Sequence, residues 1–309
     1  MTGTVYKSTG SWYSVKSDDG KFYNARIKGI FKIDDITSTN PIAVGDAVEF
    51  DKENEGEGSV IITKIGDRKN YVARQSPRAK HAHHIIAANL DQSLLLATIK
   101  DPRTSQGFID RFLVACEMYH VPAIVVFNKT DVYKEKDWKE FERMKGLYEA
   151  VGYKVFPVSL KEGKGIDDVN VLLKDKVTLI SGHSGVGKSS FINAVVPESE
   201  IRTQDVSGWS GKGQHTTTFA EMYDLPINGQ IIDTPGMREF GLVDVKKEEL
   251  SGYFPEMRAR LNDCQFNNCQ HINEPDCAIK QAVIDGEIDE DRYVSYVNIL
   301  ESLKEHNWE

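Results

Sequence analysis

The sequence lacks several features that would place the protein in or across a membrane. No uninterrupted apolar run approaches the roughly 18 residues that a membrane-spanning helix needs. The first residues, MTGTVYKSTGSWYS, lack the basic-then-apolar pattern of a secretory signal. Cysteines number four in 309 residues, and three of them fall within one polar segment. In a reducing compartment such clustering favours a metal site over disulfides. We therefore expect a cytoplasmic protein without a membrane partner.

An excess of positive charge is also missing. Asp and Glu number 47 against 38 Lys and Arg, which gives a formal net charge of −9 at pH 7. This balance argues against general binding to nucleic acid, so an RNA-binding surface would have to be a local basic patch. The hydrophobic content of 40% and the charged content of 28% are those of a soluble globular protein. The length predicts two or three domains.

The first 70 residues are rich in β-branched and aromatic residues, with several alternating stretches that predict short strands. Turn signals at Asp19-Gly20 and Gly45-Asp46 separate these stretches. Such a pattern predicts a small β-barrel, either an OB-fold or an SH3-like barrel. The next segment, 67–84, is polar and basic without apolar periodicity, and we interpret it as a linker. Its basic residues are Arg68, Lys69, Arg74, Arg78 and Lys80.

The middle of the chain alternates between short apolar runs and helical segments. The expected strands are 93–99, 123–127, 154–159 and 176–181, and the expected helices between them are 107–119, 134–150 and 165–173. This alternation predicts a parallel sheet with helices on both faces. Asn228-Gly229 marks a tight turn between two antiparallel strands. The tail is mostly helical, with an amphipathic stripe of Ile284, Ile288, Tyr293, Val297, Leu300 and Leu303. The expected fold class is a multidomain α/β protein.

The stretch GHSGVGKSS matches the phosphate-binding pattern G-x-x-x-x-G-K-[ST]. It follows one of the predicted strands and precedes a predicted helix. Its glycines let backbone N–H groups surround phosphates without a side-chain clash, and the helix N-terminus adds a favourable dipole. Lys188 would supply a positive charge to the outer phosphates, and the Ser189 hydroxyl would bind Mg²⁺. The expected phosphate-binding residues are Gly182, His183, Ser184, Gly185, Val186, Gly187, Lys188, Ser189 and Ser190.

A guanine-binding pattern, Asn128-Lys129-Thr130-Asp131, follows another apolar strand and so lies at a carboxyl end of the sheet. The Asp131 carboxylate can accept hydrogen bonds from the N1–H and the 2-amino group of guanine, a pair of donors that adenine does not offer. Asn128 would face the opposite edge of the base, and the Lys129 stem would lie along the ring. Ser159, at the end of the next strand, would lie near the base.

Asp233-Thr234-Pro235-Gly236 supplies the remaining GTPase element. Asp233 can hold Mg²⁺ through water, and the Gly236 N–H can face a γ-phosphate. Along the chain the guanine-binding pattern comes first, followed by the loop with Ser159, the phosphate loop and the Asp233–Gly236 switch motif. This is a rotation of the usual GTPase order with no element missing. We interpret this order as a circularly permuted GTPase domain, a rearrangement that closely spaced surface termini tolerate.

The residue that normally orients the attacking water is absent. Ras-like GTPases carry a glutamine directly after this motif, whereas this chain has Met237, so we expect slow intrinsic hydrolysis or another water-positioning group. The long segment 197–219 occupies the place of the first switch of GTPases. Thr217 in this segment is the expected Mg²⁺ ligand, with Thr216 and Thr218 as alternatives. His215 is the candidate for orienting the water, and pairing with backbone or phosphate is an equal alternative for it. The expected catalytic set is His215, Lys188, Thr217 and Gly236.

The clustered cysteines form the pattern C-x4-C-x-H-x5-C in a polar, helix-breaking segment. Three thiolates and an imidazole are the ligands of a closed tetrahedral zinc site. With four protein ligands no position is left for water, so the zinc would be structural. The expected ligands are Cys264, Cys269, His271 and Cys277. A tail with few apolar anchors needs such a cross-link for its stability.

Taken together, these motifs resemble one known family over essentially the whole chain. A β-barrel, NKTD before GHSGVGKSS, then GQHTTT, DTPGMREFGL and C-x4-C-x-H-x5-C, is similar to the bacterial small-ribosomal-subunit biogenesis GTPases, the RsgA/YjeQ family. The resemblance implies an OB-fold in residues 1–70, a circularly permuted GTPase in 71–241 and a zinc-binding helical domain in 242–309. An apolar residue at Met237 is part of the family pattern, whereas Gln214 stands where the family commonly has Arg or Lys.

The resemblance also implies a function in late maturation of the small ribosomal subunit. It implies contacts with that subunit's rRNA and a hydrolysis of GTP to GDP and phosphate that the subunit stimulates. The implied cofactors are one structural Zn²⁺ and Mg²⁺ with GTP. We expect a monomer whose RNA binding depends on the basic residues around 68–80 and weakens steeply with salt.

Two rival functions stay open on the sequence alone. One is a GTP-dependent RNA-binding module with little hydrolysis of its own, which Met237 supports. The other is a GTPase that acts on a protein or membrane partner, with the barrel as an adaptor. No lipidation motif or basic amphipathic helix favours a membrane.

Overall fold

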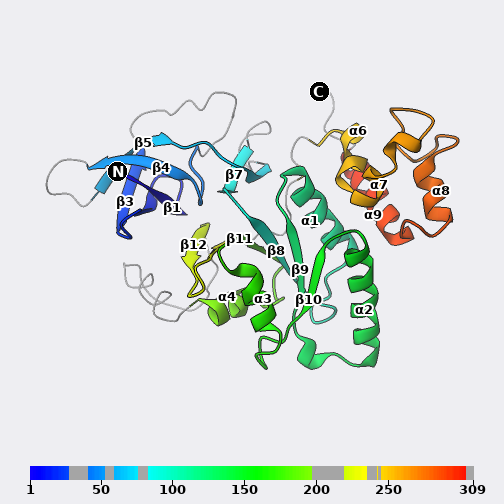
Figure 1. Cartoon of the computed structure of the whole chain (residues 1–309), viewed down its shortest axis with the longest axis horizontal. Coiled ribbons are helices and arrows are strands. Elements are labelled where there is room, and N and C mark those ends of the chain that lie inside the picture. The colour runs from blue at the N-terminus through cyan, green and yellow to red at the C-terminus, as the bar shows by residue number, and fades with distance from the viewer. Residues whose placement is uncertain are drawn as a thin grey trace.

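The structure, a computed structural model, describes residues 1–27, 41–52, 59–75, 83–196, 219–234, 242 and 245–303. Figure 1 shows a β-barrel at one end, an α/β domain in the middle and a group of helices at the other end. No helix within the described ranges is long and apolar enough to cross a membrane. The fold class expected from the sequence is confirmed.

The N-terminal barrel consists of five strands, β1 (Thr2–Ser8), β2 (Tyr13–Ser17), β3 (Phe22–Ile27), β4 (Ala47–Lys52) and β5 (Ser59–Ile65). The strand order 1-2-3-5-4 closes on itself through a β1–β4 pair, and β3–β5 is the one parallel pair among these five strands. Alternate residues such as Val5, Val15 and Phe50 fill the interior. A closed Greek-key barrel of this order is an OB-fold, which decides between the two barrels that the sequence allowed.

Part of the segment 67–84 is not a linker, and that interpretation of the sequence was wrong. Its residues contribute to an antiparallel hairpin formed by β6 (Tyr71–Gln75) and β7 (His83–Ala88). Val72 and Ala73 are buried. One pair of small apolar residues within a basic segment creates no periodic signal, so the strand could not be recognised from the pattern.

Arg68, expected on an exposed basic patch, is used inside the protein instead. Its Nε and Nη2 atoms donate to the two carboxylate oxygens of Asp46 at 2.7 and 2.6 Å. Asp46 is fully buried, and a buried carboxylate needs a counter-charge. Arg74 is exposed, whereas Arg78 and Lys80 lie outside the described residues. The expected patch therefore loses one of its members.

The central domain is a six-stranded sheet in the order β10 (Lys154–Pro157), β9 (Ala123–Phe127), β8 (Gln92–Ala97), β11 (Val177–Ser181), β13 (Gln230–Asp233) and β12 (Glu221–Asp224). All neighbours are parallel except β12 and β13, which form the predicted hairpin around Asn228-Gly229. The phosphate loop and the guanine-binding pattern both follow parallel strands, so they share one edge of this sheet.

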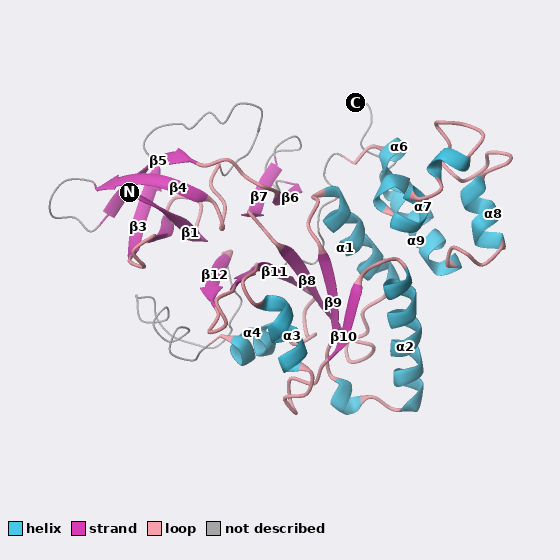
Figure 2. Ribbon diagram, viewed as in Figure 1, coloured by secondary structure: helices cyan, strands magenta, loops and turns pink. Residues whose placement is uncertain are grey.

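Helices cover both faces of the sheet (Figure 2). On one face lie α1 (Gln106–Met118) and α2 (Glu135–Ala150), packed with Leu95 and Val125; on the other lie α3 (Ile166–Leu173) and α4 (Lys188–Val195), packed with Leu94 and Val126. Neighbouring residues of a strand point to opposite faces, so continuous apolar runs are what a sheet covered on both sides requires. The predicted α/β alternation is thus confirmed.

The sheet does not end at β12. Lys7 of β1 pairs with Glu221 of β12, so the barrel extends the central sheet into one of eleven strands. Ion pairs accompany this backbone contact, between Lys7 and Glu221 at 3.2 Å and between Lys16 and Asp224. The Tyr6 hydroxyl donates to the Asp224 carboxylate at 2.7 Å.

The C-terminal region consists of short helices, α6 (Lys247–Leu250), α7 (Pro255–Arg258) and α8 (Ala278–Ile284), followed by the longer α9 (Glu290–Ser302). Its core includes Phe254 and Tyr296, and Val114 of α1 packs into the same cluster. The predicted stripe fails at Ile284, which is 76% exposed. Asp285 and Gly286 end α8 there, so Ile284 and the α9 residues do not share one helix.

Candidate nucleotide and metal sites

The phosphate loop connects the end of β11 to the start of α4, as the sequence predicts. Three of its glycines, Gly182, Gly185 and Gly187, have positive φ angles of +149°, +87° and +100°. A Cβ atom at Gly187 would lie 2.5 Å from the Asn128 amide nitrogen, and one at Gly182 would lie 2.6 Å from the Leu96 carbonyl oxygen. Glycine is therefore required for the backbone angle and also for the space.

The lysine of this loop meets the switch motif at the end of β13. The Lys188 ammonium lies 2.9 Å from the Asp233 carboxylate and donates to the Thr234 carbonyl at 2.8 Å. The side chains of Lys188 and Asp233 are 18% and 6% exposed. Ser189 and Ser190, in the first turn of α4, are exposed. One edge of the sheet thus brings together a cation, a carboxylate and two hydroxyls, which is a donor set suited to a phosphate and its Mg²⁺.

The guanine-binding pattern touches the phosphate loop directly. The Asn128 side chain donates to the Val186 carbonyl at 2.8 Å and accepts from the Leu160 N–H at 3.3 Å. The Ser159 hydroxyl, fully buried, donates to the Asp131 carboxylate at 2.9 Å. Asn128 therefore connects its own loop to the phosphate loop and to the loop that contains Leu160. The Ser159 hydroxyl orients the Asp131 carboxylate.

Lys129 is the residue of this pattern with an unusual backbone. Its φ angle is +68°, and its ammonium donates to the Asp101 carbonyl. A left-handed conformation costs energy for a residue other than glycine, and such strain is typical of ligand-binding turns. The inverted order of the motifs along the chain does not separate them in space.

Several residues of the expected catalytic set cannot be placed. His215, Thr217 and its alternatives Thr216 and Thr218, together with Gln214, Gly236 and Met237, lie outside the described residues. Sequence reasoning also missed a neighbour of the phosphate loop, Thr104, whose hydroxyl lies 2.7 Å from His183 Nε2. A lone threonine between a strand and a helix belongs to no motif, so the sequence carried no signal for it.

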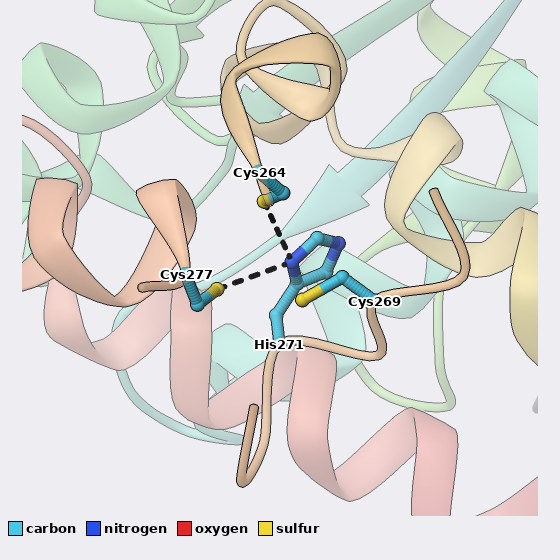
Figure 3. A group of neighbouring side chains, drawn as sticks. All are labelled: Cys264, Cys269, His271 and Cys277. Atoms are coloured by element: carbon cyan, nitrogen blue, oxygen red, sulfur yellow. Dashed lines mark hydrogen bonds between the residues drawn. The ribbon is translucent and has the colours of Figure 1, made fainter. Parts of the chain in front are cut away.

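The C-terminal cysteines and histidine converge on one point (Figure 3). The potential ligand atoms of Cys264, Cys269, His271 and Cys277 all lie within 4.8 Å of one another. His271 Nδ1 is 3.6 Å from the Cys264 sulfur and 3.4 Å from the Cys277 sulfur. Zinc bonds of about 2.3 Å to sulfur and about 2.0 Å to nitrogen in a tetrahedron would leave these atoms about 3.5 Å apart. The four residues therefore fit a tetrahedral zinc ion.

The surroundings of His271 also suit a metal ligand. The residue is 1% exposed, and burial lowers the pKa of its imidazole, which favours the neutral form that binds metals. The Tyr293 hydroxyl donates to its carbonyl at 2.6 Å. The Glu274 carboxylate accepts from the backbone N–H groups of Gln270 and Ile272, each at 2.9 Å. Partial burial raises the pKa of Glu274, but these backbone hydrogen bonds outweigh it and lower the pKa to about 2.

The fold and these motifs together define a circularly permuted GTPase with an OB-fold barrel and a cysteine–histidine cluster that fits a zinc ion. Comparison with known proteins identifies the family. The RsgA N-terminal domain family matches residues 2–60, and the RsgA GTPase family matches residues 65–243. The chain belongs to the RsgA family of GTPases, which confirms the resemblance drawn from its motifs.

Relatives match along almost the full length. A protein of Flavobacterium psychrophilum described as small ribosomal subunit biogenesis GTPase RsgA is 54% identical over 302 residues, which cover 97% of this chain and 93% of the relative. A protein of Christiangramia forsetii with the same description is 50% identical over 307 residues, covering 99% and 98%.

Solved structures show the same arrangement of domains. The crystal structure of YjeQ from Thermotoga maritima has a TM-score of 0.79 at 32% identity and covers 99% of both chains. The structure of YloQ, described as a circularly permuted GTPase, has a TM-score of 0.75 at 28% identity and covers 100% of this chain and 96% of that one. The permutation inferred from the order of the motifs is confirmed.

Proposed function

We propose that this GTPase acts in the cytoplasm, as a monomer, during late maturation of the small ribosomal subunit. In this proposal it contacts the rRNA of the subunit, and the subunit stimulates hydrolysis of GTP to GDP and phosphate. The descriptions of its relatives as small ribosomal subunit biogenesis GTPases support the assignment. The observation that carries it is the direct contact between the guanine-binding pattern and the phosphate loop, made by Asn128 and Val186 at 2.8 Å.

The residues of this site have distinct roles in the proposal. Asp131, oriented by Ser159, selects guanine because its carboxylate accepts from two donors on one edge of the base. The Lys129 stem lies along the base. The backbone amides of residues 182–187 hold the phosphates, and Lys188 exchanges its contact with Asp233 for contact with the outer phosphates.

Magnesium supplies positive charge to the phosphates when it is bound. Ser189 and Asp233 are the described residues that would hold it, Ser189 directly and Asp233 through water, and Thr217 would complete the set. Gly236 would face the terminal phosphate with its N–H, and His215 would orient the attacking water. Since Met237 replaces the usual glutamine, we expect that hydrolysis depends on stimulation.

In this proposal exposed aromatic residues of the barrel contribute to the contact with RNA, in addition to the basic residues around 68–80. Trp12 and Phe22 are 48% and 53% exposed, and the Lys16 ammonium lies 5.7 Å from the centre of the Phe22 ring. Exposed aromatic rings beside a cation are the usual means of holding unpaired bases. The zinc ion, with four protein ligands, would be structural. We propose domain boundaries of 1–70, 71–241 and 242–309 for the barrel, the GTPase and the zinc-binding region.

One experiment tests the function. GTP turnover is measured for the purified protein alone, with isolated small ribosomal subunits, and with large subunits as the matched control. A large increase with small subunits only is expected. Turnover that stays low under all three conditions would instead favour a GTP-dependent RNA-binding module. The Asp131→Asn variant is included because it should lose GTP turnover and accept xanthosine triphosphate, whose 2-oxo group matches an amide donor.

A further inference from the structure

The loop from β8 to α1 packs against the phosphate loop, although it belongs to no nucleotide-binding motif. The Thr104 hydroxyl, in a residue 3% exposed, lies 2.7 Å from Nε2 of His183. Phe108, in the first turn of α1, meets the same imidazole edge to face, with ring centres 5.5 Å apart and planes at 88°. The side chain of His183, the second residue of the phosphate loop, is therefore held by Thr104 and Phe108, which lie outside that loop.

The hydrogen bonds around Thr104 run in one direction. Its Oγ1 accepts from the Thr98 N–H at 2.9 Å, so its own proton can be donated to His183. Nδ1 of His183 lies 3.1 Å from the Ser184 carbonyl oxygen, which can only accept. In the neutral ring Nδ1 therefore carries the proton and Nε2 accepts from Thr104. Every donor in the series from Thr98 through Thr104 and His183 to Ser184 meets an acceptor.

This series ends on the peptide between Ser184 and Gly185. In a trans peptide the carbonyl and the amide N–H point in opposite directions, so a fixed Ser184 carbonyl also fixes the Gly185 N–H. Pro102 lies near the same glycine, because a Cβ atom at Gly185 would be in van der Waals contact, at 3.4 Å, with two atoms of the Pro102 ring. The loop between β8 and α1 thus acts on one amide of the phosphate loop through His183.

A fixed amide matters most in the transition state. During hydrolysis negative charge develops on the oxygens of the leaving diphosphate, and donors aligned in advance stabilise that charge without reorganising. A loosened amide can still bind the ground state after a small adjustment, so its loss affects kcat more than KM.

We propose that Thr104 is a positioning residue for GTP hydrolysis, acting through His183 on the Ser184–Gly185 peptide. This role rests on the proposed assignment of residues 182–190 to the phosphates. It adds to the GTPase residues one that the motifs do not contain.

The test compares Thr104→Val with Thr104→Ser under subunit-stimulated conditions. The valine variant removes the donor to His183, and kcat should fall about five- to tenfold while KM changes less than about twofold. The serine variant keeps the hydroxyl and should restore kcat. Thr178→Val is the matched control, since Thr178 is a buried threonine that accepts from Gln92 at 2.9 Å and lies at the opposite end of β11 from the phosphate loop. It should lower the melting temperature and leave kcat unchanged.

A double-mutant cycle separates positioning from general damage. His183→Ala removes the other partner of the same bond and should give a similar fall in kcat; should Thr104→Val fail to fold, this variant and Thr104→Ser carry the test. The combined variant should be no slower than the slower single one. A wild-type kcat in Thr104→Val, a slow Thr104→Ser, or fully additive losses would each overturn the inference. If the wild-type protein itself showed no GTP turnover, the proposed function would fail instead.

Discussion

The α/β domain contacts the barrel and the C-terminal helices in two very different ways. Toward the barrel it uses strand pairing, the buried Tyr6 and Val44, and partly exposed charges, with Lys7 36% and Glu221 11% exposed. Toward the C-terminal helices it uses buried charges, because Arg292 of α9 and Asp110 of α1 are 1% and 0% exposed and lie 2.8 Å apart. Water therefore screens the ion pairs of the first junction and is excluded from those of the second. The ion pairs toward the barrel should therefore contribute less to stability than those toward the C-terminal helices.

The buried junction has further partners that fix its geometry. Glu256 accepts from Arg292 Nε and Nη2 at 2.8 and 3.0 Å, and the Tyr148 hydroxyl donates to Asp110 at 2.9 Å. The guanidinium also lies over the Phe254 ring, 4.8 Å from its centre. A cation with two carboxylates and an aromatic face satisfies most of its donors, which a buried charge requires.

Removing the zinc ion should have the largest effect of all the changes considered, and this effect should fall on the C-terminal region. On the order of 10 kcal/mol of binding free energy links a structural zinc ion to the folding of small domains. Cys269→Ser, or treatment with a chelator, should therefore unfold the C-terminal region and leave the melting of the barrel unchanged. Zinc content and hydrogen exchange of α8 and α9 measure this. Cys116→Ser, far from the cluster, serves as control, and protection of α8 that survived chelation would contradict the zinc assignment.

Arg292→Met should have the next largest effect, because it leaves buried carboxylates without their counter-charge. We expect a loss of about 3–5 kcal/mol of unfolding free energy, measured by urea denaturation. The matched control is Arg260→Met, which removes a surface pair with Glu287 that is 38% and 53% exposed and should cost less than about 1 kcal/mol.

The loss of unfolding free energy in Arg292→Met should depend on pH in a defined direction. Burial raises the pKa of Asp110, and Arg292 opposes that rise in the wild type. Without the arginine the pKa of Asp110 should rise further, so the folded variant should take up a proton at a higher pH than the wild type. The deficit of the variant should hence be smaller at pH 5 than at pH 8. An equal deficit at both values would show that the carboxylate is not the source of the loss.

Glu274→Gln should have a moderate effect within the metal-binding loop. The folded pKa of about 2 lies below the ordinary value of 4.5, so the charged carboxylate stabilises the fold above pH 4.5. That contribution disappears as pH falls through about 2. Allowing for solvent screening, the variant should lose about 1–2 kcal/mol at pH 7. Unfolding at pH 7 and pH 3 measures it, with the exposed Glu142→Gln as control; a variant whose deficit does not shrink at pH 3 would refute the role.

Lys7→Met should have the smallest effect and should sharpen the contrast between the junctions. A partly exposed ion pair contributes less than about 1 kcal/mol, and salt screens it. Its deficit should fade between low salt and 1 M salt, whereas that of Arg292→Met should persist. Denaturation at both salt concentrations measures this. A loss of unfolding free energy in Lys7→Met that did not depend on salt would contradict the difference between the two junctions.

The parts of the site that the sequence predicted are those whose residues lie close together in the chain. The phosphate loop, the guanine-binding pattern and the cysteine–histidine cluster each occupy one short stretch of the chain, with glycine or ligand spacing that chemistry dictates. Alternating apolar runs likewise predicted the central sheet and its helices. Placing the guanine-binding pattern at the ligand-binding edge of the sheet needed only the rule that ligands bind at the carboxyl ends of parallel strands.

What the sequence could not predict depends on residues that are distant in the chain. Thr104 and His183 are 79 positions apart, and Asp110 and Arg292 are 182 apart. No periodicity marks such partners, because a single hydrogen bond or ion pair is chosen by tertiary packing. Arg68 was misread for the same reason, since a basic residue next to a polar segment looks solvent-exposed until its buried partner Asp46 is known.

The pairing of Lys7 with Glu221 has a consequence for how the domains could be separated. Without the barrel, β12 would be the last strand of the central sheet and would present unpaired N–H and C=O groups to solvent. Such an open border recruits strands from other molecules and starts aggregation. We therefore expect a shortened protein that begins after the barrel to self-associate more than the full chain.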